Sequence, residues 1–164
     1  MARLQGDSDT KSGIMPSSAM PETKQIPPVP SEATLHEAAL AYLARYAASR
    51  VGVIRALDRK VARWARLSPE AGEEILVQCR AAVRRVAARL EQAGLIDDAQ
   101  FAASRVRSLT RSGKSRRAVA AHLGARGIGG EILDEALPED AEAEFAACLI
   151  LARKRRIGPF RPED

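Results

Sequence analysis

The amino-acid sequence repeats itself, and this repeat limits the possible folds more than any other feature. A shift of 66 residues aligns residues of the same chemical type: Leu35 with Phe101, Leu40 with Val106, Leu43 with Leu109, Arg45 with Arg111, Ser49 with Ser115, Arg50 with Arg116, Val53 with Val119 and Leu57 with Leu123. A further shift of 44 residues places Phe101-Ala102-Ala103 on Phe145-Ala146-Ala147, and Arg111 on Arg155. A unit of this size buries little apolar surface alone, so the chain is expected to be an array of small units that pack on their neighbours.

Each unit is expected to contain three helices, because apolar residues recur at helical spacing behind capping residues. Ser31, Ser49, Asp97 and Ser115 are the predicted N-caps of the first, second, fourth and fifth helices. A long third helix is predicted from near Pro69 to Gly94, and a short sixth helix and a seventh helix that opens at Pro138 follow later.

The fold class is therefore all-α, with tandem three-helix, helix-turn-helix-like repeats in an elongated, curved array. Residues 1–31, rich in Pro and Ser, are expected to form a disordered tail, 32–94 a first repeat, 95–137 a second, and 138–164 the start of a truncated third. Trp64, Phe101 and Phe145 are predicted core anchors, with Leu149 and Ala152 also turned inward. The incomplete third repeat should leave an apolar stripe, so a partner contact through residues 138–156 is possible unless the helix folds back on the second repeat.

The composition supports helices and an intracellular location. Only 4% of the residues are aromatic, which argues against a large sheet core. No apolar run is as long as the roughly 20 residues of a membrane span, and the N-terminus lacks the order of a secretory signal. Cys79 and Cys148 are too few and too distant for a disulfide scaffold, so the expected compartment is the cytoplasm.

Charge is segregated along the chain, and Arg outnumbers Lys by 21 to 5. Residues 45–66 hold seven bases and one acid, residues 105–117 six bases and no acid, and residues 153–161 five bases and no acid. Residues 131–144 reverse the pattern, with seven acids and no base. Separate blocks of charge favour an electrostatically steered partner, and guanidinium groups suit bidentate contact with phosphate or carboxylate.

The candidate binding residues are basic residues at equivalent places in the two repeats, where they would present one face to a periodic partner. They are Arg45, Arg50, Arg55 and Arg59 in the first repeat, and Arg105, Arg111, Lys114, Arg116 and Arg117 in the second. The alternative for each one is an ordinary solubilising arginine.

The sequence offers no catalytic, metal or cofactor site. His36 and His122 lie 86 residues apart without ligands at metal-binding spacing, and Asp97 with Asp98 is expected to cap a helix and complement its dipole. The glycines at 127, 129 and 130 lack the preceding strand and the following Lys of a phosphate-binding loop. We therefore expect a protein that is not an enzyme.

Two segments resemble the RecX family. GLIDDAQFAASRVRS (94–108) is similar to the family's segment between the first and second repeats, and GKSRRAVAAHLGARGI (113–128) to its second-repeat helix pair. The likeness extends more weakly over about residues 35–156. It implies tandem three-helix repeats that lodge in the groove of the RecA filament and inhibit strand exchange, ATP hydrolysis and coprotease activity, in DNA repair and the SOS response. The segment 59–89 departs from the family in being longer and more basic.

Two other functions fit the residues. A helix, a Gly-containing turn and a basic helix over 105–126 have the outline of a helix-turn-helix that binds DNA directly, although few Asn or Gln residues are available to read bases. A non-enzymatic helical scaffold could instead dock a basic partner on the acidic block 131–144.

Overall fold

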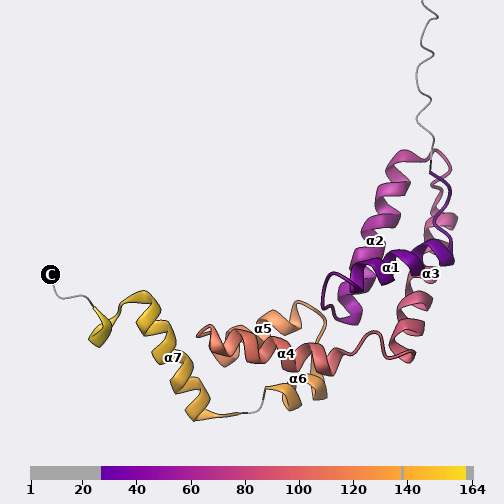
Figure 1. Ribbon diagram of the computed structural model, residues 1–164. Coiled ribbons are helices and arrows are strands. Elements are labelled where there is room, and N and C mark those ends of the chain that lie inside the picture. Colours follow the sequence, from indigo (N-terminus) through magenta and orange to yellow (C-terminus); the bar gives the residue numbers. More distant parts are fainter. Residues whose placement is uncertain (1–26, 138, 162–164) are drawn as a thin grey trace, which may run out of the picture.

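The computed structural model describes residues 27–137 and 139–161, and in these ranges the chain forms seven α-helices, one 3₁₀ helix and no strand. The helices follow one another along a curved, elongated array, as Figure 1 shows. The all-α prediction is confirmed. The predicted disordered tail falls mostly outside the described residues.

The first unit consists of α1 (Glu32–Leu43), α2 (Arg50–Leu67) and α3 (Glu73–Gln92). The predicted caps are confirmed, since the Ser31 and Ser49 side chains accept hydrogen bonds from the backbone of the first turn. Helix α3 begins later than predicted, because Gly72 rather than a residue near Pro69 is the N-cap. Eleven buried side chains form the core of the first unit: Leu35, Ala39, Val53, Leu57, Val61, Cys79, Ala82, Val83, Val86, Leu90 and Ile96.

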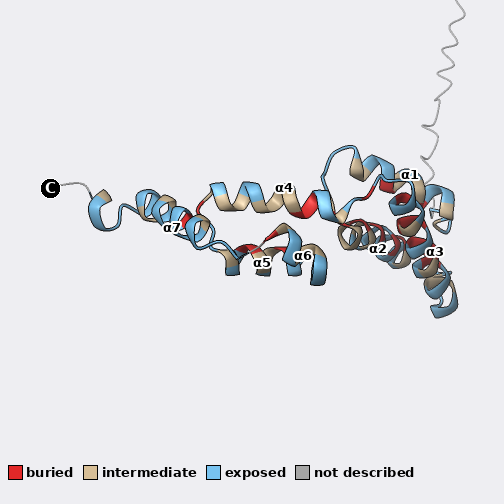
Figure 2. Cartoon of the chain, turned by 90° about the horizontal axis from the view of Figure 1, so that it is seen from below, coloured by how far each residue is buried: buried red, intermediate tan, exposed pale blue. Residues whose placement is uncertain are grey.

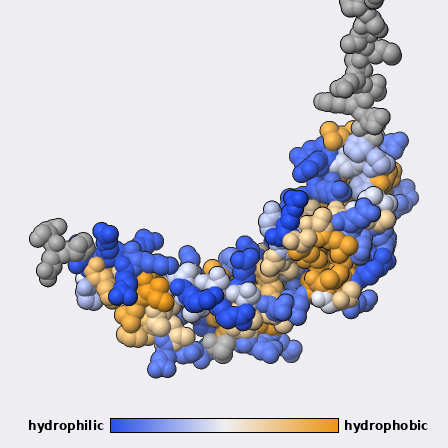
Figure 3. Space-filling view, in the orientation of Figure 1, coloured by the Kyte–Doolittle hydropathy of each residue, from blue (hydrophilic) through white to orange (hydrophobic). Residues whose placement is uncertain are grey.

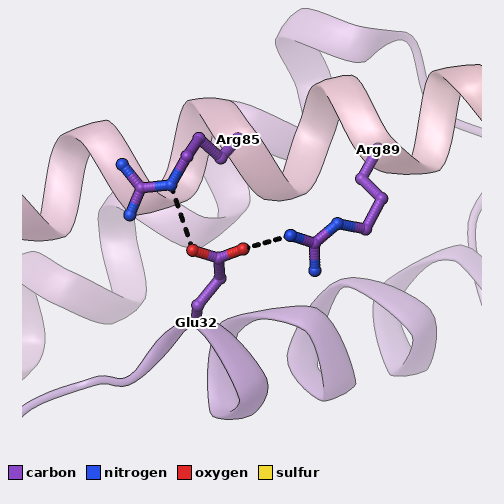
Figure 4. Close-up of polar contacts among 3 residues, drawn as sticks. All are labelled: Glu32, Arg85 and Arg89. Carbon is purple, nitrogen blue, oxygen red and sulfur yellow. Dashed lines mark hydrogen bonds and ion pairs between the residues drawn. The ribbon is translucent and has the colours of Figure 1, made fainter.

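Helices α1 and α3 are also linked by charge (Figure 4). Arg85 donates a hydrogen bond to one carboxylate oxygen of Glu32 at 3.0 Å, and Arg89 donates to the other oxygen. The hydrogen bond from Arg85, reinforced by the charge of both arginines, lowers the pKa of Glu32. This exposed cluster orients the start of α1 on α3.

The second unit consists of α4 (Asp98–Arg111), α5 (Arg116–Gly124) and α6 (Gly130–Ala136). Asp97 and Ser115 are the N-caps, as predicted. Its core is smaller because α5 and α6 are short: Phe101, Ala102, Val119, Leu123, Ile128 and Leu137. Three of the residue pairs in the 66-residue shift are buried in both units: Leu35 and Phe101, Val53 and Val119, and Leu57 and Leu123.

Helix α7 (Ala141–Arg155) follows the second unit and leads into a 3₁₀ turn, η1 (Gly158–Phe160). It starts after the N-cap Asp140, and the predicted start, Pro138, lies outside the described residues. Its buried residue is Ala147, next to Gly113, where an added Cβ would lie 3.0 Å from the backbone nitrogen of Leu151. The close approach of the two backbones seats α7 on the end of α4.

The prediction that Phe145 and Leu149 point inward is wrong. Phe145 is 64% exposed and Leu149 is 44% exposed, whereas the other two predicted anchors, Trp64 and Phe101, are buried. Figure 2 shows the same contrast, with buried residues inside the first unit and α7 mainly exposed or intermediate. The physical reason is that no further helices among the described residues cover that side of α7.

No helix in ranges 27–137 and 139–161 is long and apolar enough to cross a membrane, and no metal-binding cluster of His, Cys, Asp or Glu occurs there. Both cysteines are free: Cys79 is buried, which raises the pKa of its thiol, and Cys148 is exposed.

Candidate interface at the joint between the units

The first turn of α2 contacts both the start of α4 and the residues that follow α5, and we call this contact the first joint. The Ser49 hydroxyl donates to the backbone oxygen of Arg126 at 2.7 Å, and Arg55 Nη1 donates to the backbone oxygen of Ala125 at 2.6 Å. The backbone N–H of Arg50 donates to Asp98 Oδ1 at 2.7 Å. One carboxylate of the second unit therefore caps a helix of the first, and the side chains of Arg55 in α2 and of its N-cap Ser49 satisfy carbonyls just after α5.

Gly127 allows this close approach. It has a φ of +79°, and a Cβ built there would lie 2.3 Å from Val51 Cγ2 and 2.7 Å from Val51 Cβ. Only a residue without a side chain fits both the left-handed backbone and the space against Val51. Gly127, which lies in the segment 113–128 that carries the sequence resemblance, therefore allows the first joint to close.

Three arginines meet at a hollow of about 230 Å³ beside the first joint. Arg55 and Arg59 reach it from α2, and Arg126 reaches it from the second unit, next to Phe101 and Tyr42. The Arg59 side chain makes no hydrogen bond or ion pair within the described part of the chain. Arginines from two units line this hollow, and guanidinium groups are suited to binding carboxylate or phosphate groups.

One of the arginines that line this hollow, Arg126, also contacts His122. Arg126 Nε donates a hydrogen bond to His122 Nε2 at 3.2 Å, which requires an unprotonated nitrogen there. Desolvation by burial, followed by the positive charge of Arg126, Arg105 and Lys114, lowers the pKa of His122. A neutral imidazole in this position orients the Arg126 side chain without adding to the positive charge of the neighbouring basic residues.

The same construction occurs where α7 meets the second unit, and we call this contact the second joint. The backbone N–H of Arg116 donates to Glu144 Oε2 at 2.8 Å, as that of Arg50 does to Asp98. Lys154 Nζ donates to the backbone oxygen of Ser112 at 2.9 Å. The repeat in the sequence is thus a repeat of joints as well as of helices.

The predicted binding residues lie in three kinds of place. Arg50 pairs with Glu91 at 3.0 Å and Arg116 Nη2 donates to the Leu137 backbone oxygen at 3.1 Å, so each holds the second helix of its unit to the third. Arg55 and Arg59 come together at the hollow. The rest lie apart from it, along α4, in the turns, or at the start of α5: Arg45, Arg105, Arg111, Lys114 and Arg117.

One of these, Arg105, lies with its guanidinium carbon 5.4 Å from the centre of the Phe101 ring. Sequence reasoning missed Arg126, which falls in the turn after α5, outside any helical pattern. The available signal was its position inside the segment 113–128 that carries the resemblance.

The sequence of the chain is similar to those of known proteins. The family description "RecX, second three-helix domain" matches residues 97–137, which contain α4, α5 and α6. The chain is 36% identical over 132 residues to the regulatory protein RecX of Myxococcus xanthus, an alignment that covers 79% of this chain and 68% of that protein. The chain belongs to the RecX family.

Two other RecX proteins support the same assignment. The regulatory protein RecX of Mycobacterium sp. (strain JLS) is 33% identical over 141 residues, which cover 83% of this chain and 70% of that protein. That of Agrobacterium fabrum is 42% identical over 66 residues, which cover 40% of this chain and 35% of that protein. No solved structure shows significant similarity to the chain. The first joint of this RecX-family chain is therefore the place where the recognised second domain meets the helices before it.

Proposed function

We propose that this chain is a non-catalytic regulator that binds the RecA nucleoprotein filament and inhibits its recombinase, ATPase and coprotease activities. The observation that carries the proposal is the convergence of Arg55, Arg59 and Arg126, from two successive units, on one hollow at the first joint. Membership of a family of regulatory proteins supports the general role.

The shape of the chain suits a polymeric partner. A filament repeats its subunits at a fixed step, and an elongated array repeats its joints in the same manner. Figure 3 shows strongly hydrophilic side chains along the inner edge of the curve, over the first and second units. Acidic side chains of the RecA subunits are the proposed ligands of the joint arginines, because bidentate guanidinium contacts give both affinity and orientation.

DNA is a second, weaker partner in this proposal. Phosphates in the groove of the filament would meet the other exposed basic residues of the candidate set, Arg45, Arg111, Lys114 and Arg117. Such contacts position a protein without reading sequence, which agrees with the scarcity of Asn and Gln on α4 and α5.

The test measures RecA-dependent ATP hydrolysis on single-stranded DNA at increasing concentrations of the chain. We expect substoichiometric inhibition. Arg59→Glu should raise the concentration needed for half-inhibition about tenfold, which corresponds to about 1.4 kcal/mol. Arg84→Glu, an exposed arginine on α3, is the matched control and should remain within about twofold of the parent.

Arg50 and Arg116 are unsuitable for this test, because both hold helices together and their loss would also destabilise the fold. Co-sedimentation with RecA filaments, with and without DNA, separates the two partners. Unchanged hydrolysis at equal molarity, with steep salt-dependent binding of duplex DNA by the chain alone, would favour a direct DNA-binding protein instead.

A further inference from the structure

A proline-rich segment of the chain lies against the last turn of α2. Residues 27–30 read Pro-Pro-Val-Pro and directly precede the N-cap of α1. The indole N–H of Trp64 donates a hydrogen bond to the backbone oxygen of Pro27 at 2.9 Å. This contact is at the opposite end of α2 from the first joint. It is therefore separate from the hollow on which the proposed function depends.

The sequence of this segment restricts its backbone to extended forms. The pyrrolidine rings of Pro27, Pro28 and Pro30 fix φ at about −65°. A residue that precedes a proline is steered away from the helical region, and this applies to Pro27 and Val29. A segment with these restrictions favours the polyproline II conformation, whose carbonyl groups make no internal hydrogen bonds and can accept from a partner. The hydrogen bond from Trp64 uses one of these carbonyls.

The surroundings of Trp64 are those of a peptide-binding groove. Trp64 is only 4% exposed, although it does not belong to the core of the first unit. Residues 27–30, Trp64 and Leu67 border a hollow of about 280 Å³, and Leu67 is 58% exposed. Lys60 and Arg63 line the same hollow. An aromatic ring with a hydrogen-bond donor, next to an apolar side chain, is the type of surface to which Pro-x-x-Pro segments bind.

We propose that the end of α2 around Trp64 and Leu67 is a binding site for proline-rich peptides, which residues 27–30 occupy as an internal ligand. The bound segment itself shows the chemistry of the ligand, namely a Pro-x-x-Pro spacing and a backbone oxygen that accepts from the indole N–H. The basic side chains of Lys60 and Arg63 favour an acidic residue beside the prolines. A proline-rich segment of another protein binds by displacing residues 27–30.

Fluorescence of the full chain tests whether the segment covers Trp64, which is the only tryptophan in the sequence. The double variant Pro28→Gly with Pro30→Gly, called the glycine variant, removes the backbone restriction and should release the segment. The emission of Trp64 should then move to longer wavelength, and acrylamide should quench it more strongly. Helical circular dichroism should not change, because Ser31 and not a proline caps α1. Emission and quenching equal to those of the parent would overturn the proposal.

A synthetic peptide with the sequence of residues 26–32, Ile-Pro-Pro-Val-Pro-Ser-Glu, tests binding from a separate molecule. The labelled peptide should bind the glycine variant saturably in fluorescence anisotropy, and the unlabelled peptide should return the emission of Trp64 to the parent wavelength. The parent should need about tenfold more peptide, because its own segment competes at an effective concentration on the order of millimolar. The same peptide with alanine in place of each proline is the control and should not bind. Binding of both peptides alike, or of neither, would contradict the proposal.

Substitutions in the site separate the hydrogen bond from the charge. In the glycine variant, Trp64→Phe keeps an aromatic ring without the N–H donor and should lower the affinity for the labelled peptide about threefold to tenfold, as expected for one hydrogen bond. A peptide with glutamate in place of valine should bind up to about threefold more tightly, and Lys60→Glu should abolish this gain. Arg84→Glu on α3, outside the hollow, is the matched control and should leave both affinities unchanged. Full affinity in Trp64→Phe, or a gain that survives Lys60→Glu, would show that the peptide does not bind at this site.

Discussion

The two joints use one design but differ in how completely they are covered. In both, a carboxylate from the next helix along the array accepts the backbone N–H of the first residue of the second helix, Arg50 or Arg116. Only the first joint adds the residues that follow α5, through Ser49, Arg55 and Gly127. Ser49 is accordingly buried, whereas its repeat partner Ser115 is exposed.

This difference shows that the sequence repeat determines which positions are apolar, whereas the neighbouring helices determine whether those positions are buried. Phe101 and Phe145 follow the same sequence pattern, and their helices start behind the same type of aspartate cap. One is buried and the other is exposed, because α5 and α6 cover the first and no described helix covers the second. Sequence pattern sets the apolar position, and the number of neighbouring helices sets its burial.

The largest expected effect on stability comes from replacing the two equivalent phenylalanines, one at a time, by alanine. Phe101→Ala should destabilise the fold by about 3–4 kcal/mol, because it removes a buried aromatic side chain and leaves a cavity in the small core of the second unit. Phe145→Ala should cost under about 0.5 kcal/mol, since most of that ring is already in solvent. Urea denaturation of both variants measures the contrast, and equal losses would show that the face of α7 that holds Phe145 is covered.

The next effect tests the contact between Gly127 and Val51, which belongs to the first joint and has no counterpart in the second. Gly127→Ala should destabilise the fold by about 2 kcal/mol or more, because the new Cβ meets Val51 and the backbone has a positive φ. Gly124→Ala is the control and should be neutral or stabilise by up to about 1 kcal/mol, since the site is open and helical. Val51→Ala in the Gly127→Ala background should recover part of the loss. Failure to recover would place the strain in the backbone alone.

The shared element of the two joints should give a smaller, graded effect. Asp98→Ala removes the acceptor of a part-buried N–H and should cost about 1–2 kcal/mol in thermal or urea unfolding. Glu144→Ala removes the equivalent acceptor at an exposed site and should cost less than half as much. If the two losses are equal, the extra contacts of the first joint do not strengthen its cap.

Local signals in the sequence predicted most of the fold. The caps Ser31, Ser49, Asp97 and Ser115 and the apolar spacing behind them act within one or two turns, so they can be recognised without a structure. The start of α3 was displaced because Pro69 precedes a short turn that ends at the Gly72 cap.

Contacts between distant residues account for what the sequence did not predict. Asp98 was expected to complement the dipole of its own helix, but its carboxylate also accepts from Arg50, 48 residues earlier. Arg126 joins Arg55 and Arg59 only because the turn after α5 packs on α2. The repeat predicts that arginines recur, but it does not say which of them, like Arg50 and Arg116, hold helices of their own unit.

The smallest expected effect is a pH dependence that acts through the first joint alone. Because the pKa of His122 is lowered in the folded chain, the unfolded chain binds a proton more readily, and stability should fall as the pH drops below 6.5 towards the folded pKa. Protonation removes the acceptor of Arg126 and adds a charge beside Arg105 and Lys114.

His122→Gln retains an acceptor without titrating, so its unfolding midpoint should vary less between pH 7 and pH 5 than that of the parent. The same slope in His122→Gln as in the parent would show that Arg126 is held by the contact of its backbone with Ser49 and not by the imidazole.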